Sequence, residues 1–279
     1  MNRGSIPRYL RLLGITDLPH GLDGLRLLVR QHLTQVPFEN ISKLMQFDRE
    51  GVGRPMTLEE FLDGIEGHDF GGTCYSSNPF LAELLQGLGY EATLLGADMA
   101  TPNVHTSVRV RLDSTAYHVD VGYAAPFHEP IALNRLPYAV AHGHHRYVLD
   151  RRQVEGSFEL KTFDRDAHVH GYVVHPPPRT FDFFRQTIVD SFERGRTFMR
   201  CLRITRFFAD HTVELRNRRL IVYRGTESRE TTINSLAELR YAVDMDMLMP
   251  RCPVERAVSV LERLTGAPFF GEQPWADSM

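Results

Sequence analysis

The spacing of apolar residues changes once along the chain, near Glu91, and this change constrains the fold more than any other feature. Before it, apolar residues recur at helical spacing, as in 21–36 and 80–88. After it, apolar and polar residues alternate over 104–112 and 116–123, which is typical of half-buried strands. The sequence therefore predicts an α+β protein in which helices come first and a sheet follows.

Local cap and proline signals divide the chain into three expected domains. Thr57 and Glu60 have the spacing of a capping box, which predicts the start of a short helix. The three prolines at 176–178 indicate a stiff crossover, and short strands over 200–224 with helices over 235–243 and 253–264 follow it. We expect a helical domain over 1–90, a β-barrel domain over 91–180, and a crossover region with an α/β lid over 181–279.

Composition excludes several classes of function. The net charge of the 279-residue chain is −3 and no long basic run occurs, so nucleic acid is not an expected partner. No apolar run approaches the roughly 20 residues of a membrane span, and no signal peptide precedes the first helix. Three cysteines without paired spacing fit a reducing compartment. We expect a soluble cytoplasmic protein.

Cys74 is the strongest candidate for a nucleophile. It follows the paired glycines Gly71 and Gly72 and precedes an apolar helical pattern, so it lies at or near a helix N-terminus. Exposed backbone N–H groups there favour the thiolate over the thiol. Asn78 followed by Pro79 is a second cap signal, so the regular helix could begin at either point. The alternative is an inert core cysteine.

His105 and Asp120 are the candidate base and its orienting carboxylate. They lie on two successive predicted strands, joined by a turn at 113–115. A plain hairpin would leave them about 10 Å apart along the strand, so we expect a bulge or a longer loop to bring them together. His118 is a competing base, since it shares a strand face with Asp120.

With Pro37-Phe-Glu-Asn40 upstream, these residues resemble the arylamine N-acetyltransferases. That family has a Pro-Phe-Glu-Asn element, an Arg-Gly-Gly-x-Cys-Tyr-Glu loop and an Asp-Val-Gly-Phe-Gly segment, and the likeness extends from Tyr9 to about Gly271. The resemblance implies a core like that of cysteine proteases and transglutaminases. It also implies acetyl-CoA as co-substrate, bound between the barrel and the lid, and an arylamine, arylhydrazine or N-hydroxyarylamine as acceptor. By the same resemblance the substrate-binding residues are Phe38, Thr73, Tyr123, Ala124 and Phe127, although for the aromatic ones a place in the core is an equal alternative.

The chain departs from the family pattern around Cys74. Phe70 replaces the usual arginine, Ser76 replaces the usual glutamate, and Tyr123-Ala124 replaces Phe-Gly. A deleted ion pair explains the first two changes, and we expect Glu39 to have lost a partner as well. Two alternatives follow: an amide synthase of a biosynthetic pathway with the same three residues, or a catalytically weak member that binds a ligand.

Histidines and aspartates also cluster at 142–145 and 164–170. Their residue types suit a metal, but their spacing fits no closed zinc pattern. From the sequence alone we therefore expect no metal.

Overall fold

The computed structural model describes residues 4–271, which separate into two compact units. One unit holds the described residues up to Gln35 together with Cys74–Phe184, and the other holds Val36–Thr73 together with the described residues from Arg185 onward. The chain thus leaves the first unit after its second helix and returns to it at Cys74. The division into three sequential domains differs from this grouping and stays a prediction.

The first unit contains an eight-stranded antiparallel sheet and the helices of its own chain segments. The helices are α1 (Ser5–Leu12), α2 (Gly21–Gln35), α5 (Cys74–Gly87), the 3₁₀ turns η1 (Leu133–Arg135) and η2 (Phe181–Phe184). The strands are β2 (Glu91–Asp98), β3 (His105–Leu112), β4 (Thr115–Val119), β5 (Ile131–Ala132), β6 (Tyr138–His142), β7 (His145–Arg151), β8 (Phe158–Asp164) and β9 (Ala167–Pro178).

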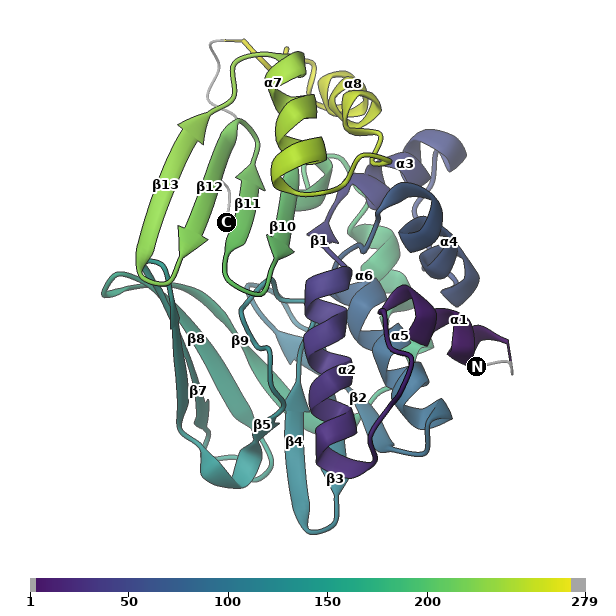
Figure 1. Ribbon diagram of the computed structural model, residues 1–279, viewed down its shortest axis with the longest axis vertical. Helices are drawn as coiled ribbons and strands as arrows, with labels where there is room; N and C mark the ends of the chain where they lie inside the picture. Colours follow the sequence, from purple (N-terminus) through teal and green to yellow (C-terminus); the bar gives the residue numbers. More distant parts are fainter. Residues whose placement is uncertain (1–3, 272–279) are drawn as a thin grey trace. The chain divides into compact units, whose positions relative to one another are not determined.

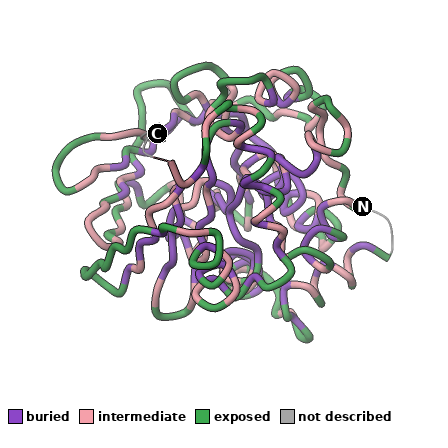
Figure 2. Tube along the Cα trace, turned by 90° about the horizontal axis from the view of Figure 1, so that it is seen from above, coloured by how far each residue is buried: buried purple, intermediate pink, exposed green. Residues whose placement is uncertain are grey.

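This sheet is a nearly closed barrel with the strand order β5-β4-β3-β2-β9-β8-β7-β6 (Figure 1). Alternate side chains of its strands fill the interior, where Leu95, Leu149 and Val174 are fully buried. Helix α5 packs against the neighbouring strands β2 and β3. In Figure 2 long buried stretches alternate with exposed loops along the chain. The predicted α+β class is confirmed.

The second unit contains a five-stranded antiparallel sheet with the strand order β1-β10-β11-β12-β13. The strands are β1 (Phe38–Glu39), β10 (Arg203–Phe207), β11 (Thr212–Arg216), β12 (Arg219–Arg224) and β13 (Glu227–Thr232). The helices are α3 (Ile41–Glu50), α4 (Leu58–His68), α6 (Arg185–Asp190), α7 (Leu236–Tyr241) and α8 (Val254–Thr265), with a 3₁₀ turn η3 (Thr197–Met199) and a π-helical turn η4 (Ala242–Asp246).

The local signals in the sequence predicted some of these elements and missed others. The capping box is present, since the Thr57 side chain accepts from the Glu60 backbone and the Glu60 side chain accepts from the Thr57 backbone. The crossover expected at 176–178 is wrong, because these prolines continue β9 to its end at Pro178. Helix α3 and strands β1, β5, β6 and β13 were not predicted.

The paired glycines allow the loop before Cys74 to pass close to other backbone. A Cβ on Gly71 would lie 1.9 Å from the carbonyl oxygen of Pro37, and Gly72 has a φ of +77°. The fully buried Glu39 carboxylate accepts hydrogen bonds from the backbone N–H groups of Gly71 (3.0 Å), Gly72 (2.6 Å) and Ser42 (2.8 Å). These backbone donors satisfy the Glu39 carboxylate in this chain, and the loss of a family partner stays a prediction.

Among the described residues, no helix combines the length and the apolarity needed to cross a bilayer.

We expect Glu39→Gln to lower the free energy of unfolding by about 1–3 kcal/mol. The amide can still accept on one side, but its NH₂ group would face a backbone N–H donor that the carboxylate now satisfies. Chemical unfolding measures the change. Glu227→Gln on the exposed strand β13 is the matched control and should stay within about 0.5 kcal/mol of the parent. Equal effects of the two substitutions would contradict the role of Glu39.

Candidate active site

Cys74 is the first residue of α5 and is tied to strand β3. The side chain of Thr106 donates to the Cys74 carbonyl at 2.7 Å, and the Asn78 amide donates to the Thr106 carbonyl at 2.5 Å. The Cys74 thiol is buried and lies 3.9 Å from the carbonyl oxygen of Val104. The helix begins at Cys74 and not at the second cap signal, so the thiol lies at the positive end of α5.

His105 begins strand β3 and bridges Cys74 and Asp120. Its Nε2 lies 2.7 Å from Asp120 Oδ2, and both side chains are buried. Cys74 lies close enough to His105 to help raise the pKa of the imidazole. The three predicted residues thus meet in the first unit, in the order thiol, imidazole and carboxylate.

The path of β4 explains how His105 and Asp120 meet. The β3–β4 hairpin is regular from the Leu112–Thr115 pair to the Val108–Val119 pair, with no shift of register. Strand β4 then ends at Val119, and Asp120 leaves the ladder. The expectation of a bulge or a longer loop is therefore wrong, because the early end of β4 lets Asp120 reach His105 without either.

Every acceptor position of the Asp120 carboxylate is used. Oδ1 accepts from the Asn78 amide and from the Gly122 backbone N–H, each at 2.9 Å. Oδ2 is bound by His105 at 2.7 Å and by the Tyr172 hydroxyl at 2.8 Å. Four donors around two oxygens leave the buried charge compensated and its orientation fixed.

The charges at this site shift both pKa values. Burial would lower the pKa of His105, but the charges of Asp120 and Cys74 and the hydrogen bond to Asp120 outweigh burial and raise it to about 10. Burial would raise the pKa of Asp120, but the charge and hydrogen bond of His105 outweigh it and lower the pKa to about 2. At neutral pH the pair is therefore imidazolium and carboxylate.

His118, the competing base, serves the network indirectly. Its Nε2 lies 2.9 Å from the Tyr172 hydroxyl, which in turn donates to Asp120. Burial lowers the pKa of His118 to about 4, so this ring is neutral at pH 7. The structure places His105, not His118, beside the thiol.

Tyr123 packs against the edge of this site. Its ring lies 5.5 Å from the His105 ring at 73°, and its hydroxyl lies 2.9 Å from Thr162 Oγ1 and also hydrogen bonds with His170 Nδ1. The Tyr123 ring therefore forms an apolar wall beside His105, and its hydroxyl is the one polar group of that wall. Phe127, by contrast, is buried in the barrel core against Tyr147.

Backbone constraints flank Asp120 on the same loop. A Cβ on Gly122 would lie 2.5 Å from Cys74 Cα and 2.8 Å from Asn78 Nδ2, so only glycine fits there. Ala124 has a φ of +61°, in the left-handed region that favours glycine. The backbone at Ala124 is therefore strained, because alanine stands where the family usually has glycine.

The remaining predicted residues belong to the second unit. Phe38 packs edge-on against Phe198, with ring centroids 5.8 Å apart. Thr73 ends the segment that precedes Cys74. Phe70 lies against the His68 ring at 5.2 Å and covers Gly64. Their role in substrate binding stays a prediction.

Two residues of the network were not singled out as site residues from the sequence. Tyr172 stacks on the His105 ring at 4.6 Å and donates to Asp120. The sequence indicates Asn78 only as a helix cap, but its side chain joins α5, β3 and the loop after β4. Its Oδ1 accepts from the Val121 backbone N–H at 2.9 Å. Its position four residues after Cys74, hence on the same helix face, was the available signal.

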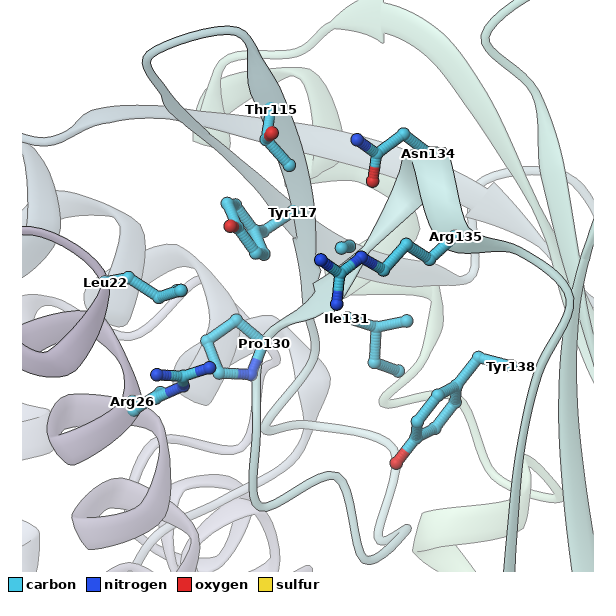
Figure 3. A pocket seen from close by; sticks show the side chains of 10 residues that line it. Leu22, Arg26, Thr115, Tyr117, Pro130, Ile131, Asn134, Arg135 and Tyr138 are labelled. Carbon is cyan, nitrogen blue, oxygen red and sulfur yellow. The ribbon is translucent and has the colours of Figure 1, made fainter.

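A separate cavity of about 270 Å³ lies at the edge of the barrel. Figure 3 shows Arg135 reaching into it from η1, with Tyr117 on one side and Tyr138 on the other. Its lining contains none of the predicted site residues, so we do not place the reaction there. The lining residues are Leu22, Arg26, Thr115, Tyr117, Pro130, Ile131, Ala132, Asn134, Arg135 and Tyr138.

The model of a protein family described as N-acetyltransferase matches residues 21–246. That range includes the site and covers most of the chain. The chain belongs to the arylamine N-acetyltransferase family. It is an enzyme of this acetyltransferase type.

Individual members of the arylamine N-acetyltransferase family are also similar to this chain in sequence and in fold. The arylamine N-acetyltransferase of Mycolicibacterium smegmatis is 25% identical over 273 residues, which are 91% of this chain and 97% of that protein. Human arylamine N-acetyltransferase 1 is 26% identical over 141 residues, 46% of this chain and 47% of that one. The solved structure of the Mycobacterium marinum enzyme shares the fold, with a TM-score of 0.76, 21% identity, and coverage of 93% of this chain and 99% of that one.

We expect Asp120→Asn to lower the pKa of His105 from about 10, because burial then outweighs the remaining charge. The charged imidazole stabilises the folded state fully below its unfolded pKa of about 6.5, and this contribution is lost as the pH rises through about 10. Relative to the parent, the free energy of unfolding of Asp120→Asn should therefore be reduced most near pH 5–6. Above pH 10 the two proteins should differ little. Histidine side-chain NMR and unfolding at several pH values measure this. Asp113→Asn in the β3–β4 turn is the control, and an unchanged pKa of His105 in Asp120→Asn would contradict the pairing.

We expect Ala124→Gly to raise the free energy of unfolding by up to about 1 kcal/mol, because glycine removes the strain of the positive φ. Urea unfolding measures the change. Ala100→Gly, at an exposed position whose φ is not positive, should instead lose about 0.4–1 kcal/mol. A loss of stability in both variants would contradict the strain at Ala124.

Proposed function

We propose that the enzyme transfers an acetyl group from acetyl-CoA to an arylamine, arylhydrazine or N-hydroxyarylamine through a thioester on Cys74. The observation that carries this proposal is the line from the Cys74 thiol through His105 to Asp120, in a chain of the arylamine N-acetyltransferase family. A thiol at a helix N-terminus beside an imidazolium is set up for nucleophilic attack.

In the first half-reaction the Cys74 thiolate attacks the carbonyl carbon of acetyl-CoA. The carbonyl oxygen becomes an oxyanion, which backbone N–H groups at the start of α5 can stabilise. The C–S bond to CoA then breaks, and the CoA thiolate takes the proton of the His105 imidazolium. Acetylated Cys74 and neutral His105 remain.

In the second half-reaction the acceptor nitrogen (or hydroxyl oxygen) attacks the thioester carbonyl. His105 removes the proton that the acceptor loses, and the Cys74 thiolate leaves. Asp120 holds the imidazole in one orientation and stabilises its charged form in both steps. The products are the acetylated acceptor and the original thiolate–imidazolium pair.

Two observations support the choice of substrates. The Mycobacterium marinum arylamine N-acetyltransferase, which shares the fold with a TM-score of 0.76, was solved in complex with CoA. In this chain the aromatic ring of Tyr123 lies against His105, where an aryl group could stack. Its hydroxyl group adds a hydrogen-bonding point that the family's usual phenylalanine lacks.

We expect mixing with acetyl-CoA to add one acetyl group to the protein, and Cys74→Ser to abolish this adduct. Adding an arylamine should remove the adduct and yield the acetylated amine. Intact-protein mass spectrometry measures both steps. Cys201→Ser should behave as the parent, because burial raises the pKa of the Cys201 thiol to about 11 and keeps it protonated.

Other outcomes separate the alternatives. An adduct that no arylamine, arylhydrazine or N-hydroxyarylamine removes would keep Cys74 as the nucleophile and indicate a different acceptor. Absence of any acetyl adduct, with rapid alkylation of Cys74, would favour the amide synthase. An adduct on Cys74→Ser would contradict the assignment of the nucleophile. Absence of any adduct, with slow alkylation of Cys74 across pH, would favour a weak, ligand-binding member.

A further inference from the structure

Two neighbouring β-turns at one end of the barrel bring together residues that are about 20 positions apart. The first turn, between β6 and β7, contains His144, and the second, between β8 and β9, follows Asp164. Because β7 pairs with β8, His145 lies directly opposite Asp164. The backbone N–H of Arg165 donates to the His144 carbonyl at 2.7 Å and joins the two turns.

Three side chains at these turns can present ligand atoms to one ion. One atom each from His144, His145 and Asp164 lies within 4.8 Å of the others. The distance from His144 Nε2 to Asp164 Oδ1 is 3.7 Å, and the two imidazole rings lie 4.3 Å apart. A tetrahedral zinc ion with bonds of about 2.0 Å holds its ligand atoms about 3.3 Å apart. Small rotations of the three side chains would therefore bring their ligand atoms to that spacing.

Asp164 supplies a second, independent observation. Its side chain is 42% exposed as a whole, but its Oδ1 is shielded from solvent, and no donor among residues 4–271 reaches hydrogen-bonding distance, since His144 Nε2 lies 3.7 Å away. A shielded carboxylate oxygen without a donor is unfavourable, whereas coordination to a cation would satisfy it. The nearest arginine on β7, Arg146, has its guanidinium 4.4 Å from the centre of the Phe163 ring. Because neighbours along a strand point to opposite faces, Arg146 does not share the face of His145.

We propose that His144, His145 and Asp164 bind a zinc ion or a similar divalent transition metal. Two imidazole nitrogens and one carboxylate oxygen suit zinc, cobalt or nickel better than calcium or magnesium. Three protein ligands leave a coordination position for water. The ion would fasten the β6–β7 turn to the end of β8. This revises the expectation of no metal, because strand pairing supplies the proximity that the sequence spacing lacks.

The test is a titration of the full-length Cys74→Ser protein with zinc after treatment with a chelator. The serine removes the Cys74 thiol, which with His105 could bind zinc by itself. We expect one zinc per chain by calorimetry and a higher unfolding temperature when zinc is in excess. Asp164→Asn and His145→Gln, each in the same background, should weaken binding by more than about tenfold and abolish the thermal shift.

His20→Gln and Asp17→Asn, at exposed positions before α2, are matched controls and should keep the parent affinity. Unfolding temperatures in chelator show whether a variant still folds. If Asp164→Asn melts like the parent in chelator and also keeps its zinc affinity, the proposal is overturned. Equal weakening in the control variants would overturn it as well.

Discussion

The buried charge of Asp120 is the constraint on which the rest of the site depends. A carboxylate removed from water is tolerated only when its lone pairs are satisfied. Here the donors come from α5, from β3, from β9 and from the loop that contains Asp120 itself. These elements must therefore occupy fixed positions relative to one another, and the same positions bring His105 to Cys74.

Glu39 shows a different solution to the same problem in the second unit. It is fully buried, and three backbone N–H groups of the described residues donate to its carboxylate. Two of these donors belong to Gly71 and Gly72, so the carboxylate shapes the loop that leads to Cys74. Phe70 meanwhile packs on His68 and Gly64. The loop is therefore held without the arginine that the family usually has at position 70.

Periodicity and local caps predicted most of the fold, because these signals act over a few residues. The capping box at Thr57 and the helix that begins at Cys74 are of this kind. Strand β13 escaped prediction because all of its residues are exposed, so its sequence lacks alternation. Strand β1 is only two residues long and is fixed by its pairing with β10.

The site was predictable to the extent that its residues have distinctive chemistry. The order cysteine, histidine and aspartate nominated Cys74 and Asp120, but the family resemblance was needed to prefer His105 over His118. The early end of β4 and the hydroxyl of Tyr172 were not predictable, since both are set by tertiary neighbours. Asn78 was visible in the sequence, but a helix cap explained it equally well.

Tyr123 connects the chemistry of the site with the far strands of the barrel. Where the family motif has phenylalanine, this hydroxyl hydrogen bonds with Thr162 on β8 and with His170 on β9. Its ring is thereby held against His105 from outside the Asp120 network. Thr162 and Asp164 lie two residues apart on β8, hence on the same face. The turn that ends β8 therefore begins two residues beyond the hydroxyl that helps to hold the Tyr123 ring, on the same face of the strand.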